Sequence, residues 1–532
     1  MDEDLTSDDN KYEISSAKSM EEKINKLTKN KIDKKLILII GGIFLLLIVI
    51  VLIIIFIIIN ANNQPEDNNN KQPDENLEIK AEIICKYEID ILDNVKILGD
   101  EFQKIPNFDI FIDGILIKYS KEYKFDKLGE HDIKYLIYDD NFNIDYIFKD
   151  ISSITYVNMT STKNAKILSL KSAFENSNNL TEIIIKGFDT SKLTSTNKLF
   201  YKTNNIDLNN FEIDTSNIQD MSYMFAESSI NDINFNFLNT ENVKNMSHIF
   251  YKCNSLKNLK LDGFSTKNVE DMSSMFESCS SLIGLDLSNI NTNKVKNMSN
   301  LFKDCISLQT LDISSLNTEN VEDMSSMFDS CNTLNELNLE HFKTNNVKKM
   351  SHMFKSCSSL KELNIKHFDT TQVEDLSYMF AYDHSLKELF IDNFDTINVN
   401  NFSHIFADCN LLNEINISNF NTINCEDMSS MFEGCSSVKE LDVSNFITNK
   451  VIDMSYLFYG CSLLTSLNIA KFDTKLVINM AGMFGSCGGL TILDVSHLET
   501  NKVENMSKMF EHCNNLNEID VSNFDTSKVK DM

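Results

Sequence analysis

Hydrophobic side chains recur along this sequence with a period of 26 residues. The clearest unit, LDVSNFITNKVIDMSYLFYGCSLLTS, begins at Leu441, and a phenylalanine marks the same position in each copy. A fixed period of roughly 20–50 residues is typical of a solenoid, in which each unit buries its apolar face against its neighbours. From Phe250 onward every step is 26 residues. The marker positions are Phe174, Phe200, Phe225, Phe250, Phe276, Phe302, Phe328, Phe354, Phe380, Phe406, Phe432, Phe458, Phe484 and Phe510.

One half of each unit has the spacing of a short helix. Met272, Met275, Phe276 and Cys279 occupy positions that share one face of a 3.6-residue period, which predicts that the methionines belong to the core. Asp271 precedes them as a predicted helix N-cap. The same Asp or Asn recurs at Asp323, Asp375, Asp427, Asp453, Asn297, Asn479 and Asn505.

The other half has the alternation of a half-buried strand. Leu285 and Leu287 flank a polar residue, and with the leucine three positions earlier they form an L-x-x-L-x-L pattern. The pattern is the strand signature of leucine-rich repeats. The predicted fold class is therefore an α/β solenoid, a leucine-rich-repeat-like stack with one short strand and one short helix per 26-residue repeat. A small β-rich cap and a single transmembrane helix are predicted to precede it.

The repeat also resembles a known family. The block DMSSMF, the cysteine that follows it and the segment SNFDT are similar to the BspA-like leucine-rich class, the DUF285-type repeats. The resemblance covers residues from about 140 to 532. It implies a cell-surface protein with a role in adhesion and recognition, and it supplies no catalytic residue.

The limits of the repeat array follow from the same period. A step of 26 residues back from Phe174 reaches Phe148, so the solenoid is predicted to span residues 140–532 with about 15 repeats. Residues 77–139 alternate without that period, which predicts a β-rich N-terminal capping region. Met532 lies 26 residues after Met506 and is the first methionine of another predicted helix, and no cap follows it, so the C-terminal end is predicted to be uncapped. We expect either an incomplete sequence or end-to-end pairing with another chain.

A membrane anchor is predicted near the N-terminus. Residues 36–59 are apolar and long enough to cross a bilayer, whereas a signal peptide has a shorter apolar segment. Lysines crowd the preceding flank, so residues 1–35 are predicted to be a cytoplasmic tail. Residues 60–76 are predicted to be an extracellular spacer. The predicted location is the plasma membrane, single-pass, with the repeats extracellular.

Composition removes several functions. The net charge is -29, and every basic residue is a lysine, which argues against nucleic acid as a partner. No H-E-x-x-H, G-x-S-x-G or Walker A motif occurs, so the chain is predicted not to be an enzyme and to need no cofactor.

Cysteines form a second periodic column, which could bind a metal, form disulfides or remain as free thiols. Because no C-x-x-C occurs, no metal site is predicted. Disulfides between stacked units are geometrically conceivable, but the column lies on the predicted buried face, which favours free thiols. Asp383 interrupts it. The members are Cys253, Cys279, Cys305, Cys331, Cys357, Cys409, Cys435, Cys461, Cys487 and Cys513.

Polar residues between the strand leucines form the candidate ligand-binding face. They point away from the sheet, and solenoids often bind along such a surface, although these side chains could simply solvate it. Phe390 is an apolar exception in the same repeat as Asp383. The candidates are Lys260, Asp286, Asp312, Asn338, Asn364, Phe390, Asn416, Asp442, Asn468, Asp494 and Asp520.

Potential N-glycosylation sites have the sequence N-x-S/T. They are Asn158, Asn179, Asn245, Asn297, Asn401, Asn416 and Asn505.

The predicted function is a membrane-anchored cell-surface recognition or adhesion protein that binds an extracellular protein or glycan through its solenoid. The alternative is a structural surface coat or spacer without a specific ligand. Signalling through residues 1–35 is a weaker third hypothesis, because that segment is short and lacks a recognisable docking module.

Overall fold

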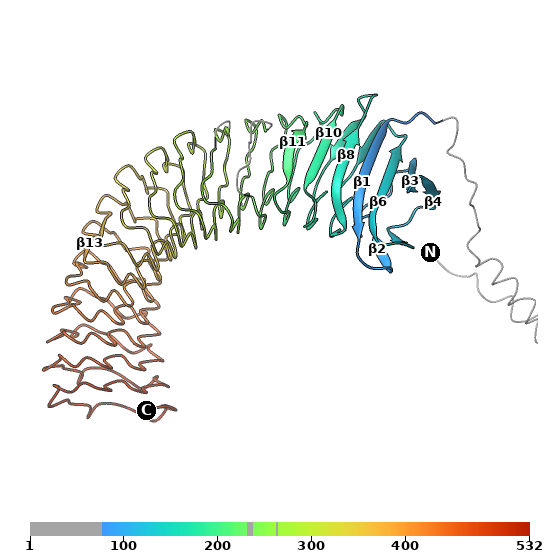
Figure 1. The fold of residues 1–532 in the computed structure, drawn as a ribbon. Coiled ribbons are helices and arrows are strands. Elements are labelled where there is room, and N and C mark those ends of the chain that lie inside the picture. The colour runs from blue at the N-terminus through green and yellow to red at the C-terminus, as the bar shows by residue number, and fades with distance from the viewer. Residues whose placement is uncertain (1–76, 231–237, 262–263) are drawn as a thin grey trace, which may run out of the picture. The chain divides into compact units, whose positions relative to one another are not determined.

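The computed structural model describes residues 77–230, 238–261 and 264–532. Most of its regular strands lie toward the N-terminal side, whereas β12 and β13 belong to later repeats (Figure 1). The strands are β1 (Ala81–Ile89), β2 (Asn94–Lys96), β3 (Phe108–Ile112), β4 (Ile115–Ile117), β5 (Glu122–Lys124), β6 (Gly129–Ile137), β7 (Asn141–Asn143), β8 (Ile154–Thr160), β9 (Lys166–Ser169), β10 (Glu182–Lys186), β11 (Asp207–Phe211), β12 (Glu362–Asn364) and β13 (Glu388–Phe390).

One sheet joins the N-terminal strands to the first repeats. Its order is β11-β10-β8-β1-β6-β3-β4, with β1 antiparallel to both β6 and β8 and with β8, β10 and β11 mutually parallel. Alternate residues of β1 are buried, as in a strand packed on one face. The pairing of β1 with β8 satisfies the edge that the first repeat strand would otherwise expose.

In the segment predicted to be helical, each repeat forms consecutive tight turns. Met327 N–H donates to the Met324 carbonyl at 3.2 Å, which closes a four-residue turn with Ser326 at its third position. Ser326 has a φ of 55°, the left-handed conformation that a type II turn requires there. Its own N–H donates to the Ser351 carbonyl of the next repeat at 2.9 Å.

Two left-handed residues, four positions apart, recur in successive repeats. The first series includes Tyr223, His248, Ser274, Asn300, Ser326, His352, Tyr378, His404, Ser430, Tyr456, Gly482 and Lys508. The second includes Glu227, Lys252, Ser278, Asp304, Ser330, Ser356, Tyr382, Asp408, Gly434, Gly460, Ser486 and His512.

These left-handed residues correct the predicted fold class. Residues 77–230, 238–261 and 264–532 contain no helix, so the structure is a β-solenoid and the prediction of an α/β solenoid with one helix per repeat is wrong. A residue with positive φ cannot continue a right-handed helix. The 3.6-residue spacing identified the inward side chains correctly, but two successive turns also bring them to one side.

The predicted N-caps belong to the turns instead. Asp323 Oδ1 accepts the Ser325 N–H at 2.9 Å, which is the bond of an Asx turn. Asp323 also bridges to Asn297 in the preceding repeat and to Lys349 in the following one. The Asp and Asn of this column therefore hold neighbouring repeats in register, and they cap no helix.

The strand half of most repeats is extended but rarely long enough to form a regular ladder. β12 and β13 pair in parallel over three residues, with Asn364 opposite Phe390. Two isolated bridges, Asp286 with Asp312 and Ser466 with Ile492, are the other pairings in this half among the described repeats after β11. Most of these repeats therefore lack the regular strand that was predicted for each of them.

A column of phenylalanine rings forms the centre of the core. The rings from Phe148 to Phe510 stack with centroid distances of 5.6–6.1 Å between successive repeats. Stacked pairs contribute about 0.5–1.5 kcal/mol each beyond the burial of their area. Tyr135 of β6 continues the column, because its ring lies 5.8 Å from Phe148 and 5.6 Å from Phe108. The N-terminal strands therefore share one core with the repeats.

A threonine column supplies a second set of contacts between repeats. The buried Thr292 hydroxyl donates to the Asn317 carbonyl at 2.8 Å and accepts the Asn317 N–H at 2.7 Å. The sequence signal was the recurring Thr of SNFDT, whose role the pattern alone did not reveal. Other members are Thr215, Thr240, Thr266, Thr318, Thr344, Thr370, Thr396, Thr422, Thr448, Thr474 and Thr500.

The cysteine column consists of free thiols, as the sequence favoured. Each thiol donates to a phenylalanine carbonyl in the preceding repeat; Cys279 donates to Phe250 at 3.1 Å and Cys409 to Phe380 at 3.0 Å. Burial raises the pKa of Cys279 to about 12. Since the thiolate is the reactive form, burial lowers the reactivity of the fully buried members of the column, whereas Cys513 is half-buried.

Asp383 replaces a cysteine in this column. It is 0% exposed, and neither carboxyl oxygen has a hydrogen-bond partner. Burial raises the pKa of Asp383 well above its ordinary value, so the folded state retains the neutral carboxyl over a wider pH range than the unfolded chain does.

The predicted location is also corrected. Within residues 77–230, 238–261 and 264–532, no helix is long and apolar enough to cross a membrane. The predicted tail 1–35, span 36–59 and spacer 60–76 lie outside the described residues. The described residues therefore do not support the predicted single-pass plasma-membrane location with a cytoplasmic N-terminus.

Replacing Asp383 by cysteine is expected to stabilise the solenoid increasingly as the pH rises. Above a pH of about 3.9 the unfolded chain loses the Asp383 proton while the folded state retains it. Stability therefore falls by up to about 1.4 kcal/mol per pH unit until the raised folded pKa is reached. Urea unfolding midpoints of Asp383→Cys and the unmodified protein should diverge between pH 5 and pH 8.

The exposed Glu388 of the same repeat provides the control: Glu388→Gln should change the free energy of unfolding by no more than about 0.5 kcal/mol, as substitutions of exposed side chains usually do. If Asp383→Cys raised the urea unfolding midpoint equally at pH 5 and pH 8, Asp383 would already be ionised in the folded state.

Relief of left-handed strain is testable at Ser326. Ser326→Gly is expected to raise the free energy of unfolding by about 0.5–1 kcal/mol, because glycine adopts positive φ without steric cost. Ser326→Val should lower it by about 1–2 kcal/mol. The neighbouring Ser325, whose φ is not positive, is the matched position, and Ser325→Gly should not stabilise the protein in the same denaturation assay.

Candidate functional site

The predicted strand-face residues lie in a row along successive repeats and are mostly exposed. Asp286 Oδ1 accepts the Ser288 N–H at 2.9 Å, and Asp312 Oδ1 accepts the Ser314 N–H at 3.0 Å. The same bond forms at Asn338, Asn416, Asp442, Asn468, Asp494 and Asp520. One oxygen of each side chain is thus committed to its own turn. The second carboxylate oxygen of each aspartate remains available, whereas the Asn416 amide group donates to Asp392 at 2.7 Å.

These hydrogen bonds also set the charge of the row. Bonds from Ser288 and Ser314 lower the pKa of Asp286 and Asp312 below the ordinary carboxyl value. Asp442, Asp494 and Asp520 are shifted in the same direction by the same kind of bond. The aspartates of the row are therefore ionised at neutral pH.

Three residues of the row meet in a depression of about 790 Å³, here called the strand-face depression. Asp286, Asp312 and Asn338 contribute from three consecutive repeats, and Glu336 adds a further carboxylate. The lining contains no lysine or histidine. A concave surface with three carboxylates and no cation favours a partner with positive charge.

Asn364 and Phe390 differ from the rest of the row. Both are half-buried, and they lie opposite each other in β12 and β13. The Asn364 Oδ1 atom has no hydrogen-bond partner in the structure. Lys260 is exposed and lies at the other end of the row from Asp520. The row therefore has one member in each successive repeat, and its members differ in charge and polarity.

The potential glycosylation sites are not equally accessible. Asn179 and Asn416 are exposed, whereas Asn158 is half-buried in β8. Asn245, Asn297, Asn401 and Asn505 are half-buried, and each accepts the N–H of the serine in its own N-x-S sequence. These four asparagines serve the turns, and modification of any of the seven remains a prediction.

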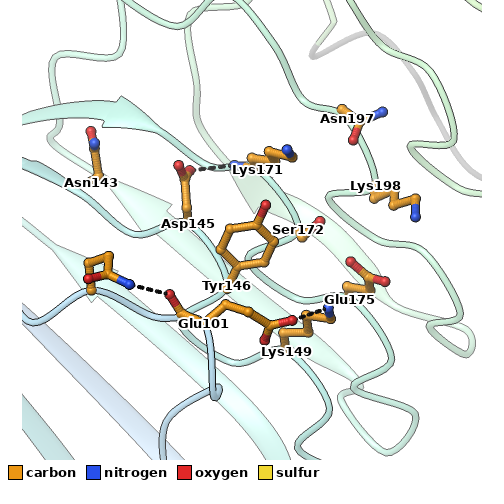
Figure 2. A pocket seen from close by; sticks show the side chains of 11 residues that line it. Glu101, Asn143, Asp145, Tyr146, Lys149, Lys171, Ser172, Glu175, Asn197 and Lys198 are labelled. Carbon is orange, nitrogen blue, oxygen red and sulfur yellow. Dashed lines mark hydrogen bonds and ion pairs between the residues drawn. The ribbon is translucent and has the colours of Figure 1, made fainter.

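A second concave site, which the sequence did not indicate, lies where the N-terminal strands meet the first repeats (Figure 2). It has a volume of about 560 Å³ and surrounds Tyr146, so we call it the Tyr146 pocket. Lysines from three repeats, Lys149, Lys171 and Lys198, line it together with Glu101 and Ser172. Tyr146, Ser172 and Lys198 each lie two positions before the marker phenylalanine of their repeat. Alignment of this position across repeats was the sequence signal that could have indicated the pocket.

The Tyr146 ring organises the charges of this pocket. The Lys149 and Lys171 Nζ atoms lie 5.5 and 5.7 Å from its centroid, within the range of cation–π contacts. Glu101 neutralises Lys149 through an ion pair of 2.7 Å (Figure 2). A hydrogen bond with Tyr146 raises the pKa of Lys171, so its ammonium group remains charged at neutral pH.

Metal ions have no evident site in the described part of the chain. No group of three or more His, Cys, Asp or Glu side chains is arranged to hold an ion there. Several histidines instead pack against aromatic rings, as where Tyr378 stacks between His352 and His404 at 4.7 and 4.2 Å.

Comparison with protein families matches most of the chain to one family. The family described as "Mycoplasma protein of unknown function, DUF285" matches residues 143–260, 168–285, 271–364, 355–465 and 436–532. No curated protein matches the sequence significantly.

Solved structures show weaker similarity. A leucine-rich cell-surface protein from Faecalibacterium prausnitzii is 14% identical, covers 57% of this chain and 84% of its own, and gives a TM-score of 0.25. A leucine-rich-repeat protein from Leptospira interrogans is 13% identical, covers 65% of this chain and 79% of its own, and gives a TM-score of 0.20.

Proposed function

This chain belongs to the DUF285 family of BspA-like repeats, and from that premise we propose that it is a recognition protein whose solenoid binds an extended protein or glycan partner. The observation that carries the proposal is the strand-face depression, where exposed polar side chains from consecutive repeats meet on one concave surface. Solenoids commonly bind along such extended surfaces.

The electrostatics of the strand-face depression favour a cationic segment in the partner. Asp286 and Asp312 are ionised at neutral pH, and Glu336 lies beside them. The chain as a whole has a net charge of -29, which adds a long-range attraction for basic partners. We therefore expect a lysine- or arginine-rich stretch of a partner protein, or an amine-bearing glycan, to occupy the depression.

The spacer or coat function remains the second candidate, because one observation favours it. Each Asx residue from Asp286 onward that forms the turn bond already has a structural role in its own repeat. A row that exists only to shape turns would tolerate substitution of its exposed atoms without any effect on binding.

Reversal of charge in the strand-face depression separates these candidates. The double variant Asp286→Lys, Asp312→Lys should weaken binding to a lysine-rich peptide at least tenfold, measured by isothermal titration at about 0.15 M salt. The matched control is Asp494→Lys, which lies in the same row but outside the depression. Binding of the unmodified protein should weaken as the salt concentration rises.

Equal binding by the double variant, or no binding of the unmodified protein to basic peptides, matrix proteins and a glycan panel, would contradict the recognition function and favour the spacer.

Phe390 tests whether the row makes an apolar contact as well. Phe390→Asp is expected to weaken binding of a matrix protein or cell surface that the unmodified protein recognises, because it removes a half-buried ring from the row. Phe390→Leu should largely preserve that binding. If both variants bind like the unmodified protein in a surface-binding assay, Phe390 does not contact the partner.

A further inference from the structure

The Tyr146 pocket has the geometry of a separate binding site. Tyr146, Ser172 and Lys198 occupy the same column in three consecutive repeats, and the small Ser172 lies between two large side chains. Ser172 is 1% exposed, and its short side chain leaves a notch, that is, a gap between the side chains of Tyr146 and Lys198. The notch and the wall beside it enclose about 560 Å³, within the range of small-ligand sites.

The N-terminal region builds the wall of the pocket. Gly99 N–H donates to the Ile147 carbonyl at 2.9 Å. A Cβ atom at position 99 would lie 2.0 Å from the Tyr146 carbonyl oxygen, so only glycine permits this approach. Glu101 follows two residues later and is held by its ion pair with Lys149. The pocket is therefore preformed, with its wall packed directly against the backbone of Tyr146.

Ammonium groups without a carboxylate partner mark the opposite side. Lys149 pairs with Glu101, but among the described residues neither Lys171 nor Lys198 forms an ion pair. Asp145, which also lines the pocket, accepts the backbone N–H of Lys171 at 2.8 Å and acts on the Lys171 ammonium group without forming an ion pair with it. The ammonium groups of Lys171 and Lys198 contact tyrosine rings, at 5.7 Å from Tyr146 and 5.3 Å from Tyr201.

The lining as a whole combines three kinds of group. It offers ammonium donors, a half-exposed tyrosine ring, and neutral amide groups from Asn143 and Asn197, with the Asp145 carboxylate beside them (Figure 2). Glu175 adds an acceptor. A simple anion would use the ammonium groups alone, whereas a sugar uses hydroxyl donors and acceptors together with a ring face.

We propose that the Tyr146 pocket binds a saccharide unit that carries a carboxylate, such as a uronic acid. Lys171 and Lys198 bind the carboxylate through charge-assisted hydrogen bonds, and Tyr146 packs against the sugar ring. Glu175 accepts hydrogen bonds from the sugar hydroxyls, and the Asn143 amide accepts and donates them. Asn197 contributes its Oδ1 as an acceptor, because its amide nitrogen already donates to Ser222.

The test compares three probes on the full chain by saturation-transfer NMR and titration: methyl glucuronoside, methyl glucoside and inorganic sulfate. We expect glucuronoside to bind at least tenfold more tightly than glucoside, and sulfate to compete only weakly. Equal affinity for glucuronoside and sulfate would identify a simple anion site and overturn the saccharide proposal, as would absence of glucuronoside binding.

Two variants assign the interaction to the pocket. Lys171→Met combined with Lys198→Met should reduce glucuronoside affinity at least tenfold, while Lys252→Met, a lysine on a later repeat outside the pocket, should not. Urea midpoints equal to that of the unmodified protein verify folding. Unchanged affinity in the double lysine variant would overturn the proposal.

This site is independent of the strand-face depression. Asp286→Lys with Asp312→Lys should leave glucuronoside binding unchanged, so failure at one site is distinguishable from failure at the other.

Discussion

The backbone of each repeat divides its hydrogen bonds between two directions, and the rest of the solenoid depends on that division. In the turn segment, alternate amides close local turns and the intervening amides donate to the next repeat, as at Met327 and Ser326. The alternation requires left-handed residues, each of which costs about 1–2 kcal/mol when it is not glycine. The contacts between repeats offset that cost, because the Phe148–Phe510 column stacks at every step and the buried threonines and thiols are hydrogen-bonded across repeats.

The N-terminal strands continue the backbone pairing and the core of the repeats, and they also form part of the Tyr146 pocket. β1 pairs with β8, and Tyr135 extends the aromatic column, so the sheet and the repeats share backbone bonds and core. The loop that begins at Gly99 then packs against Tyr146 and forms one wall of a pocket. The strand-face depression arises differently, from repetition alone, because equivalent Asx residues of adjacent repeats lie side by side.

Sequence patterns predicted which side chains point inward more reliably than they predicted the conformation of the backbone. Met275, Phe276 and Cys279 are buried as expected. Ser274 directly before Met275 and Ser278 directly before Cys279 have positive φ, so the segment is not helical. Serine gives no sign of a left-handed conformation, although Gly434, Gly460 and Gly482 in equivalent positions of later repeats were a usable hint. The strand-face row was found because period-2 alternation shows which residues point outward. The Tyr146 pocket was missed because its residues come from one loop and three repeats.

The sequence by itself determined the period, the side chains that enter the core and the family, because burial in a solenoid imposes the same residue type at the same position of every repeat. Only the tertiary structure decided how the backbone connects those positions, since a helix and a pair of tight turns can present the same apolar face. It also decided where polar groups converge, because the depression and the pocket depend on distances between repeats that no single repeat encodes. Asp383 illustrates both parts: the sequence showed the break in the cysteine column, and the structure showed a buried carboxyl group without a partner.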